Sequence, residues 1–168
     1  NKHNKLGILY KSHHIENNLV VKDGDKIIAL FRAEQKDVDV YYMRHAIVDS
    51  EYESQGIYTD YLNKSILFAE KLGFMQIISC FVAANNCIYK IKINYDFYVT
   101  SVENNSDYGC VVWISKFLNS DLEKAFKFRS GIIEYSKNLF ANSENNSNEL
   151  LKKLNENCVW LYWLFLNN

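Results

Sequence analysis

The sequence contains no proline and six glycines among its 168 residues, and its formal net charge is −1. Because basic residues are not in excess, we expect neither nucleic acid nor a membrane surface as a partner. The apolar run CVWLYWLFL is shorter than the ~18 residues that a membrane-spanning helix needs. No charged-then-apolar leader opens the sequence, so we expect a cytoplasmic protein.

Metal-binding spacings are also missing. The cysteines Cys80, Cys87, Cys110 and Cys158 form no C-x-x-C pair, and none combines with the four histidines at a zinc spacing. We therefore expect no metal site. Each cysteine lies in an apolar stretch, so we interpret all four as buried thiols in a reducing compartment.

The residues that are present favour one folded domain. Hydrophobic residues make up 48% of the chain and aromatic residues 15%, which argues against disorder. Runs rich in β-branched and aromatic residues predict strands at 18–24, 25–34, 37–48, 75–83, 98–103 and 108–118. Asp23-Gly24 predicts a hairpin turn. Helical periodicity covers residues 57–72, and Gly73 is expected to end that helix as its C-cap, whereas residues 85–97 fit either a helix or an extended run.

This order predicts a mixed α/β (α+β) fold with a mostly antiparallel sheet. The first three strands form a meander, and the unit of residues 38–82 should be a right-handed crossover between parallel strands. After residue 118 the pattern changes to helices and a final apolar run. We therefore expect a core of residues 1–118 and a helical extension of residues 119–168, which packs on the core or forms a homodimer contact.

The junction between the third strand and the first helix holds the clearest candidate site. Gly56 lies there, in the stretch EYESQGIYTDYL. A helix start presents free N–H groups and a positive dipole end, and glycine lets a phosphate or pyrophosphate approach closely. Residues 51–63 contain no lysine or arginine, so backbone amides must hold such an anion. The alternative is that Gly56 only lets the chain turn.

The order of elements, with IVDSEYESQGIYTDYL at this junction, resembles the GNAT family of acyl-CoA-dependent N-acyltransferases. The family motif Q/R-x-x-G-x-G/A falls on residues 53–58, and its backbone amides grip the pyrophosphate of coenzyme A. Only Gly56 matches strictly, since Glu53 replaces Gln or Arg and Tyr58 replaces a small residue. The resemblance covers roughly residues 19–118.

A second family marker follows the next strand. Asn85 and Phe97 have the family's spacing, although Asp96 replaces the glycine before Phe97. The resemblance implies acetyl-CoA or another acyl-CoA as co-substrate, lying in a V-shaped gap between the strands of residues 38–48 and 75–83. The residues implied to bind it are Ala46, Ile47, Val48, Ser54, Gln55, Gly56, Ile57, Tyr58, Thr59 and Asn85.

The resemblance further implies transfer of the acyl group to an amine by direct attack, the acceptor being a small molecule or a peptide. Many family members protonate the leaving thiolate with a tyrosine on the helix after Asn85. Lys92 occupies that position here, and an ammonium carries the proton that an acid needs. Tyr89 and Tyr95 lie one helical turn to either side and are the fallbacks.

The family's base is usually a carboxylate on the third strand. Tyr42 stands at that position, and His45 and Glu34 are nearby alternatives. His45 suits a base near neutral pH, but strand alternation puts it on the face opposite to Tyr42 and Arg44 unless the strand bulges.

Two other functions remain open at this stage. One is a non-catalytic domain of the same fold that binds acyl-CoA, or nothing, and serves as a sensor or an interaction domain, which the degenerate motif and the missing tyrosine favour. The other is an unrelated α/β protein in which Gly56 is only a turn residue.

Overall fold

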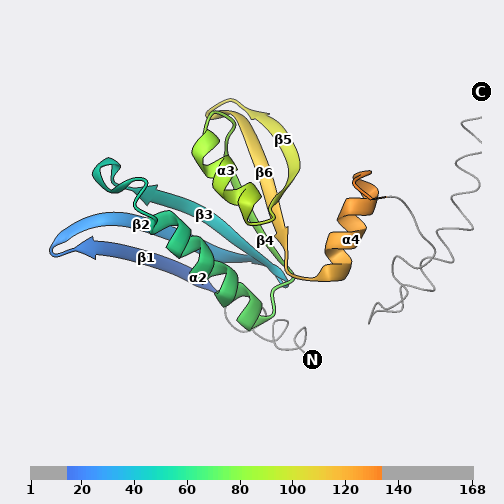
Figure 1. The fold of residues 1–168 in the computed structure, drawn as a ribbon, viewed down its shortest axis with the longest axis horizontal. Coiled ribbons are helices and arrows are strands. Elements are labelled where there is room, and N and C mark those ends of the chain that lie inside the picture. Colours follow the sequence, from blue (N-terminus) through green and yellow to red (C-terminus); the bar gives the residue numbers. More distant parts are fainter. Residues whose placement is uncertain (1–14, 134–168) are drawn as a thin grey trace, which may run out of the picture. The chain divides into compact units, whose positions relative to one another are not determined.

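The computed structural model describes residues 15–133. The chain divides into two compact units, residues 1–119 and residues 120–168. In the first unit, a six-stranded sheet has the strand order β1-β2-β3-β4-β6-β5 (Figure 1). Its strands are β1 (Glu16–Asp23), β2 (Lys26–Asp37), β3 (Val40–Val48), β4 (Gln76–Val82), β5 (Tyr98–Asn105) and β6 (Gly109–Phe117). A short 3-10 turn, η1 (Ser50–Tyr52), and the helices α2 (Ile57–Leu72) and α3 (Asn86–Asn94) connect them.

The predicted mixed sheet is confirmed. Strands β1, β2 and β3 form the antiparallel meander, and β3 pairs with β4 in parallel through the crossover helix α2. Strand β4 pairs antiparallel with β6, and β6 with β5. The ambiguous run of residues 85–97 contains the helix α3.

Strands β3 and β4 separate partway along their length. Their parallel register runs from Val40 opposite Gln76 to Met43 opposite Ser79. Strand β3 continues to Val48 and β4 to Val82 without further pairing between them. The two strands therefore diverge, as Figure 1 shows, and leave a gap in the sheet at their carboxyl ends.

Strand β3 also bulges just where it leaves β4. Arg32 of β2 is opposite His45, but the next residue, Ala33, is opposite Met43, so Arg44 is the extra residue. A bulge of one residue exchanges the faces of all residues beyond it. His45 therefore lies on the same face of the sheet as Tyr42, which simple alternation along β3 would not give.

Helix α2 covers one face of the sheet and builds the core. Its buried positions are Tyr61, Leu62, Ser65, Ile66 and Ala69, which follow helical spacing. The ring of Tyr61 stacks on Phe31 of β2, with centroids 4.0 Å apart. Gly73 ends the helix as predicted, with φ of 85° and its N–H bonded to the carbonyls of Ala69 and Glu70.

Two expectations need correction or restriction. The described cysteines are free thiols, but Cys87 and Cys110 are exposed and Cys80 is half-buried, so the prediction of buried thiols was wrong for them. An apolar neighbourhood in sequence did not reveal that Cys87 lies in the first turn of α3 and Cys110 near the start of β6. Cys158 lies outside the described residues.

The second unit is described over its first helix only. Helix α4 (Ser120–Arg129) begins where the sequence predicted a helix, and it carries an ion pair one turn apart between Lys127 and Glu123, at 2.9 Å. It ends at Arg129, two residues before Gly131, which has φ of 69°. The predicted packing of the last apolar run lies outside the described residues. None of the helices within residues 15–133 is long and apolar enough to cross a membrane.

Candidate functional site

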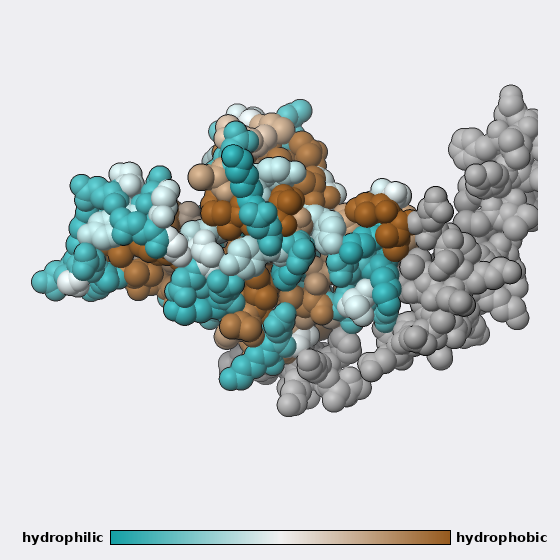
Figure 2. Space-filling view, viewed as in Figure 1, coloured by the Kyte–Doolittle hydropathy of each residue, from teal (hydrophilic) through white to brown (hydrophobic). Residues whose placement is uncertain are grey.

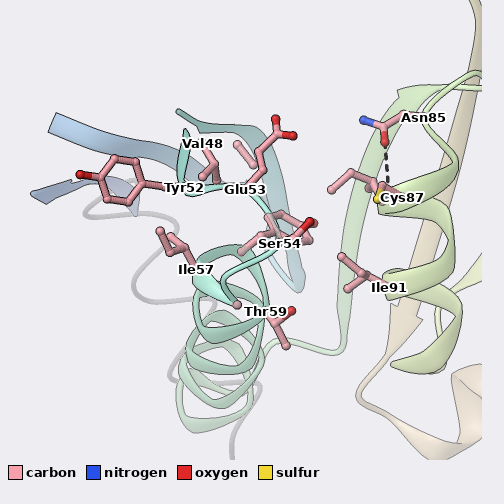
Figure 3. A pocket seen from close by; sticks show the side chains of 13 residues that line it. Val48, Tyr52, Glu53, Ser54, Ile57, Thr59, Asn85, Cys87 and Ile91 are labelled. Atoms are coloured by element: carbon pink, nitrogen blue, oxygen red, sulfur yellow. Dashed lines mark hydrogen bonds between the residues drawn. The ribbon is translucent and has the colours of Figure 1, made fainter. Parts of the chain in front are cut away.

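A cavity of about 460 Å³ lies between the loop that starts α2, the end of β3 and the start of α3. Figure 3 shows side chains from these three elements facing the same space. The cavity is lined by Ala46, Val48, Tyr52, Glu53, Ser54, Gly56, Ile57, Tyr58, Thr59, Asn85, Cys87, Ile88 and Ile91. Eight of the ten residues expected to bind the coenzyme are therefore among its walls; Ile47 and Gln55 are not.

The start of α2 leaves backbone donors free at this cavity. Gly56 is the N-cap, with φ of 84°, and no side chain caps the helix. The first intrahelical bond is donated by the N–H of Asp60 to the carbonyl of Gly56, so the N–H groups of the three preceding residues, 57–59, have no partner within the helix. A Cβ added to Gly56 meets nothing within 4 Å. The glycine is therefore required by its positive φ, and the space in front of it is open.

A network of charges holds the loop before α2 against the β1–β2 hairpin. The ammonium of Lys26 lies 2.6 Å from a carboxylate oxygen of Glu51 and 3.2 Å from one of Asp49. Its Nζ also lies 4.9 Å from the ring centre of Tyr52. The hydroxyl of Tyr52 donates to Asp23 at 2.9 Å. These contacts fix Tyr52, and with it the wall of the cavity.

A second cavity of about 220 Å³ lies in the gap between β3 and β4. Ala46, Tyr58, Asn85 and Ile88 line both cavities. The smaller one also reaches residues of the opposite face of the sheet: Arg44, His45, Ile47 and Cys80. The two cavities thus share walls and connect the α2 face of the sheet with its other face.

The backbone of β3 is available along one side of this gap. The N–H of Asp49 donates to the carbonyl of Ile28 at 2.8 Å, so that pair is hydrogen-bonded across β2 and β3. Bonding alternates along an antiparallel ladder. The N–H and C=O groups of Ala46 and Val48 therefore point away from β2, into the gap, whereas those of Ile47 face Leu30 of β2.

Lys92 is the most unusual side chain near this gap. It is fully buried, with 0% of its surface exposed. Its Nζ lies 3.5 Å from Sδ of Met43 and 4.2 Å from the ring centre of Phe97, and the ring centre of Tyr58 is 5.8 Å away. Burial lowers the pKa of this amine from 10.5 to about 7. Met43 and Tyr58 both line the smaller cavity, so Lys92 lies directly behind its wall.

The tyrosines that flank Lys92 are placed differently. Tyr89 is 41% exposed and packs its ring against Phe81, with centroids 6.1 Å apart. Tyr95 follows the last residue of α3 and is half-buried. Neither lines the two cavities. Lys92 contacts two residues that line the smaller cavity, Met43 and Tyr58, whereas Tyr89 contacts one, Phe81.

The three candidate bases share the face of the sheet opposite to α2, but they differ in their partners. Glu34 binds Arg44 at 2.8 Å and Arg32 at 3.4 Å, so its charge is already paired. The hydroxyl of Tyr42 lies 3.4 Å from Sγ of Cys80, and burial together with this contact raises its pKa. His45 is exposed and lines the smaller cavity. His45 is therefore the candidate base with access to the gap.

Two further predicted residues have structural partners of their own. The side chain of Gln55 donates to the carbonyl of Glu51 at 3.0 Å, within the loop. The side-chain oxygen of Asn85 accepts the N–H of Ile88 at 3.1 Å and caps α3, as the dashed line in Figure 3 marks. Asn85 lines the larger cavity, and this bond leaves its amide NH₂ group without a role in the cap.

Sequence reasoning missed the hydrophobic wall that α3 gives to the larger cavity. Ile88 and Ile91 follow Asn85 at spacings of three residues, and all three line it. That spacing puts them on one helical face, so this wall was readable once the helix was accepted. No local sequence pattern could have predicted the ion pairs of Lys26, because its partners are more than twenty positions away in the chain. Among the described residues, no group of three or more His, Cys, Asp or Glu side chains is arranged to hold a metal ion.

Comparison with known proteins supports the fold. No protein-family profile and no curated protein matches this sequence. Many solved structures are similar to it, and three of them illustrate the likeness. The ribosomal-protein-S18-alanine N-acetyltransferase of Escherichia coli is 15% identical, with a TM-score of 0.57 over 67% of this chain and 76% of its own. A GNAT family acetyltransferase of Elizabethkingia anophelis with acetyl-CoA bound is 15% identical, with a TM-score of 0.56 over 68% and 82%.

The third is an acetyltransferase of the GNAT family from Streptococcus pneumoniae, 14% identical, with a TM-score of 0.53 over 63% of this chain and 67% of its own. Identities this low concern the arrangement of the chain and not its chemistry. The parallel pairing of β3 with β4, their separation beyond Met43 and the helix that begins at Gly56 agree with that arrangement. This chain has the GNAT fold.

Proposed function

We propose that this protein is an acyl-CoA-dependent N-acyltransferase that transfers an acetyl group from acetyl-CoA to a primary amine. The observation that carries the proposal is the pair of cavities that share Ala46, Tyr58, Asn85 and Ile88 where β3 and β4 part. One cavity offers free backbone donors to a phosphate, and the other leads through the sheet. An acyl donor entering from one face and an amine from the other would meet in the gap.

Coenzyme binding follows from the backbone. The pyrophosphate would accept hydrogen bonds from the free N–H groups at the start of α2, where the helix dipole also favours an anion. The pantetheine arm would bond to the N–H and C=O groups of Ala46 and Val48, which face the gap. Ile88 and Ile91 would give the arm an apolar wall. The acetyl-CoA-bound protein of Elizabethkingia anophelis, which has the same fold, makes this the natural donor to test.

The chemistry then needs one base and one acid. The amine nitrogen attacks the thioester carbon, a C–N bond forms and the C–S bond breaks. His45 would take the proton that the amine loses, and the ammonium of Lys92 would give a proton to the leaving thiolate. The N–H of Ala46 would polarise the thioester carbonyl. Holding the two reactants in line is the remaining contribution of the site.

The acceptor is proposed more broadly. His45 and Arg44 stand on the face of the sheet opposite to α2, at the open side of the smaller cavity. The similar protein of Escherichia coli acts on an alanine of ribosomal protein S18 by its description. A small-molecule amine or the amine of a peptide would fit this position.

A variant of Gly56 tests the coenzyme site. Gly56→Val places a branched side chain in the open space before α2 and strains a residue with φ of 84°. We expect the affinity for acetyl-CoA, measured by calorimetry, to fall by ~1–3 kcal/mol, because the amides lose their charged partner. Gly109→Val is the matched control: it has φ of 72°, open space around it and lies outside the cavity walls. Equal acetyl-CoA affinity in wild type and Gly56→Val would refute the site.

A non-catalytic acyl-CoA-binding domain is the second candidate, because neither Tyr89 nor Tyr95 lines the two cavities. The two candidates differ in turnover and not in binding. A panel of small amines and of peptides with free amino termini, each incubated with acetyl-CoA, should yield an acetylated product by mass spectrometry. Binding of acetyl-CoA without any product across the panel would select the non-catalytic function.

A further inference from the structure

The larger cavity has an acidic wall. None of its described lining residues is a lysine, arginine or histidine, and Glu53 is an acid. Figure 3 shows the Glu53 side chain among those that line this cavity. Two more acids, Asp49 and Glu51, precede it in the same loop. The ammonium of Lys26 is bonded to both of them, so its single positive charge offsets one of their two negative charges, and Glu53 adds a further negative charge.

The cavity therefore offers little positive charge to an anion. Its donors are the N–H groups of residues 57–59, and the dipole of α2 adds about half a positive charge. Within the pyrophosphate, these groups would bind chiefly the phosphate that is joined to the pantetheine arm. Coenzyme A carries further phosphate charge on its nucleotide, including a 3′-phosphate. Among the described residues of the cavity, no cationic side chain is present to bind these additional phosphates.

We infer that this site recognises the acyl-phosphopantetheine part of its donor, and that Glu53 prevents the remaining phosphates of coenzyme A from adding affinity. The inference rests on the proposed function and specifies the class of donor. Any thioester of phosphopantetheine is then a ligand, whether or not a 3′-phosphate is attached. Apolar contacts with Ile88 and Ile91 and backbone bonds to β3 supply the recognition of the arm.

Calorimetry with three donors tests this directly. The donors are acetyl-CoA, acetyl-dephospho-CoA, which lacks only the 3′-phosphate, and acetyl-4′-phosphopantetheine. We expect their dissociation constants for the wild-type protein to agree within about threefold, a difference well below the 1.4 kcal/mol of a tenfold change. Acetyl-CoA binding more than threefold tighter than its dephospho form would overturn the inference.

Variants of Glu53 give the second arm. Glu53→Gln removes the charge and keeps the shape, so we expect acetyl-CoA to bind about two- to fivefold more tightly, the range for an exposed charge. Acetyl-4′-phosphopantetheine should gain less, because it carries less charge. The gain should shrink in ~0.5 M salt, which screens exposed charges. An equal gain for all three donors, or none, would overturn the role of Glu53.

Glu70→Gln is the matched control, since Glu70 is an exposed acid in the last turn of the same helix. At 1.5 Å per residue it lies about 20 Å from Gly56, and its change should leave all three affinities as they are. The outcomes separate the two proposals. Binding of none of the donors would refute the proposed function, whereas tight binding of acetyl-CoA alone would refute only the inference about donor class.

Discussion

Two lysines of this protein have opposite environments. Lys26 is exposed on β2, and hydrogen bonds to Glu51 and Asp49 raise its pKa. Lys92 is buried on α3, and its nearest polar contact is the thioether of Met43. Burial lowers its pKa to about 7. Lys26 has two carboxylate partners at the solvent-exposed surface, whereas Lys92 has no carboxylate partner among the described residues.

This difference in environment distinguishes Lys26, whose charge is structural, from Lys92, whose charge we propose to be functional. An exposed ion pair costs little and also contributes little. A buried amine without a carboxylate is costly, because the charged form loses its hydration. A strongly shifted pKa beside a cavity is a common mark of a functional group. Lys92 adjoins the gap between β3 and β4 through Met43 and Tyr58, which supports the proposal that it donates the proton to the thiolate.

The largest expected effect is on turnover. Lys92→Met keeps a flexible side chain of similar length and removes the proton donor. We expect the rate at saturating donor and acceptor to fall ~10²–10⁴-fold, the usual contribution of a general acid, with little change in acetyl-CoA affinity. Steady-state kinetics on any amine that the panel identifies would measure it. Lys90→Met, an exposed lysine on the same helix, is the control and should turn over normally.

The pH profile distinguishes an acid from a merely structural residue. If Lys92 must be protonated, kcat/KM should fall about tenfold per pH unit above ~7, since that profile reports the free enzyme. The same limb should be missing from the profile of Lys92→Met. Turnover of Lys92→Met within threefold of wild type, or an unchanged limb, would return the choice to Tyr89 or Tyr95, tested as phenylalanine variants.

Stability should change in the opposite direction. The unfolded chain holds the Lys92 proton up to its ordinary pKa of 10.5, whereas the folded protein loses it at about 7. The unfolded state thus binds more protons between these values, so the free energy of unfolding of the wild type rises with pH across that window. Below pH 7 the folded protein bears the full destabilisation of the buried, protonated Lys92. At ~1.4 kcal/mol per pKa unit it reaches about 5 kcal/mol as an upper limit.

Lys92→Met should therefore stabilise the protein, most strongly near pH 6–7 and least above pH ~10. Urea denaturation of both proteins at several pH values measures this difference. Lys90→Met should show no such pH-dependent gain, because Lys90 is exposed. A Lys92→Met protein that is less stable than wild type at pH 7 would contradict the picture of a desolvated amine.

Much of the fold was readable from local patterns. The hairpin turn at Gly24, the period of α2 and its cap at Gly73 depend on residues close together in the chain, and all three are confirmed. The bulge at Arg44 was stated only as a condition. It depends on the register between β2 and β3, which no residue of β3 alone determines.

The site was readable in part for the same reason. Gly56 lies at a strand-to-helix junction, which is a local feature, and the structure gives it the positive φ that favours glycine. The burial of Lys92 was not readable. The sequence around it, KIKIN, alternates charged and apolar residues, and the same pattern fits an exposed lysine such as Lys90. Only the fold, which brings Met43, Tyr58 and Phe97 around the amine, decides between the two.

The smallest expected effect belongs to Lys26. Lys26→Met removes the ion pairs with Asp49 and Glu51 and makes the loop before α2 one charge unit more negative. We expect a few-fold loss of acetyl-CoA affinity, because the loop is less fixed and more negative, with unchanged turnover at saturation. Salt at ~0.5 M should remove the electrostatic part of that loss, since exposed charges are screened within a few ångströms. Lys26→Arg should retain wild-type affinity, and Lys22→Met on the same hairpin is the control for charge. If Lys26→Met lowered turnover as much as Lys92→Met does, the distinction between the structural and the functional lysine would be wrong.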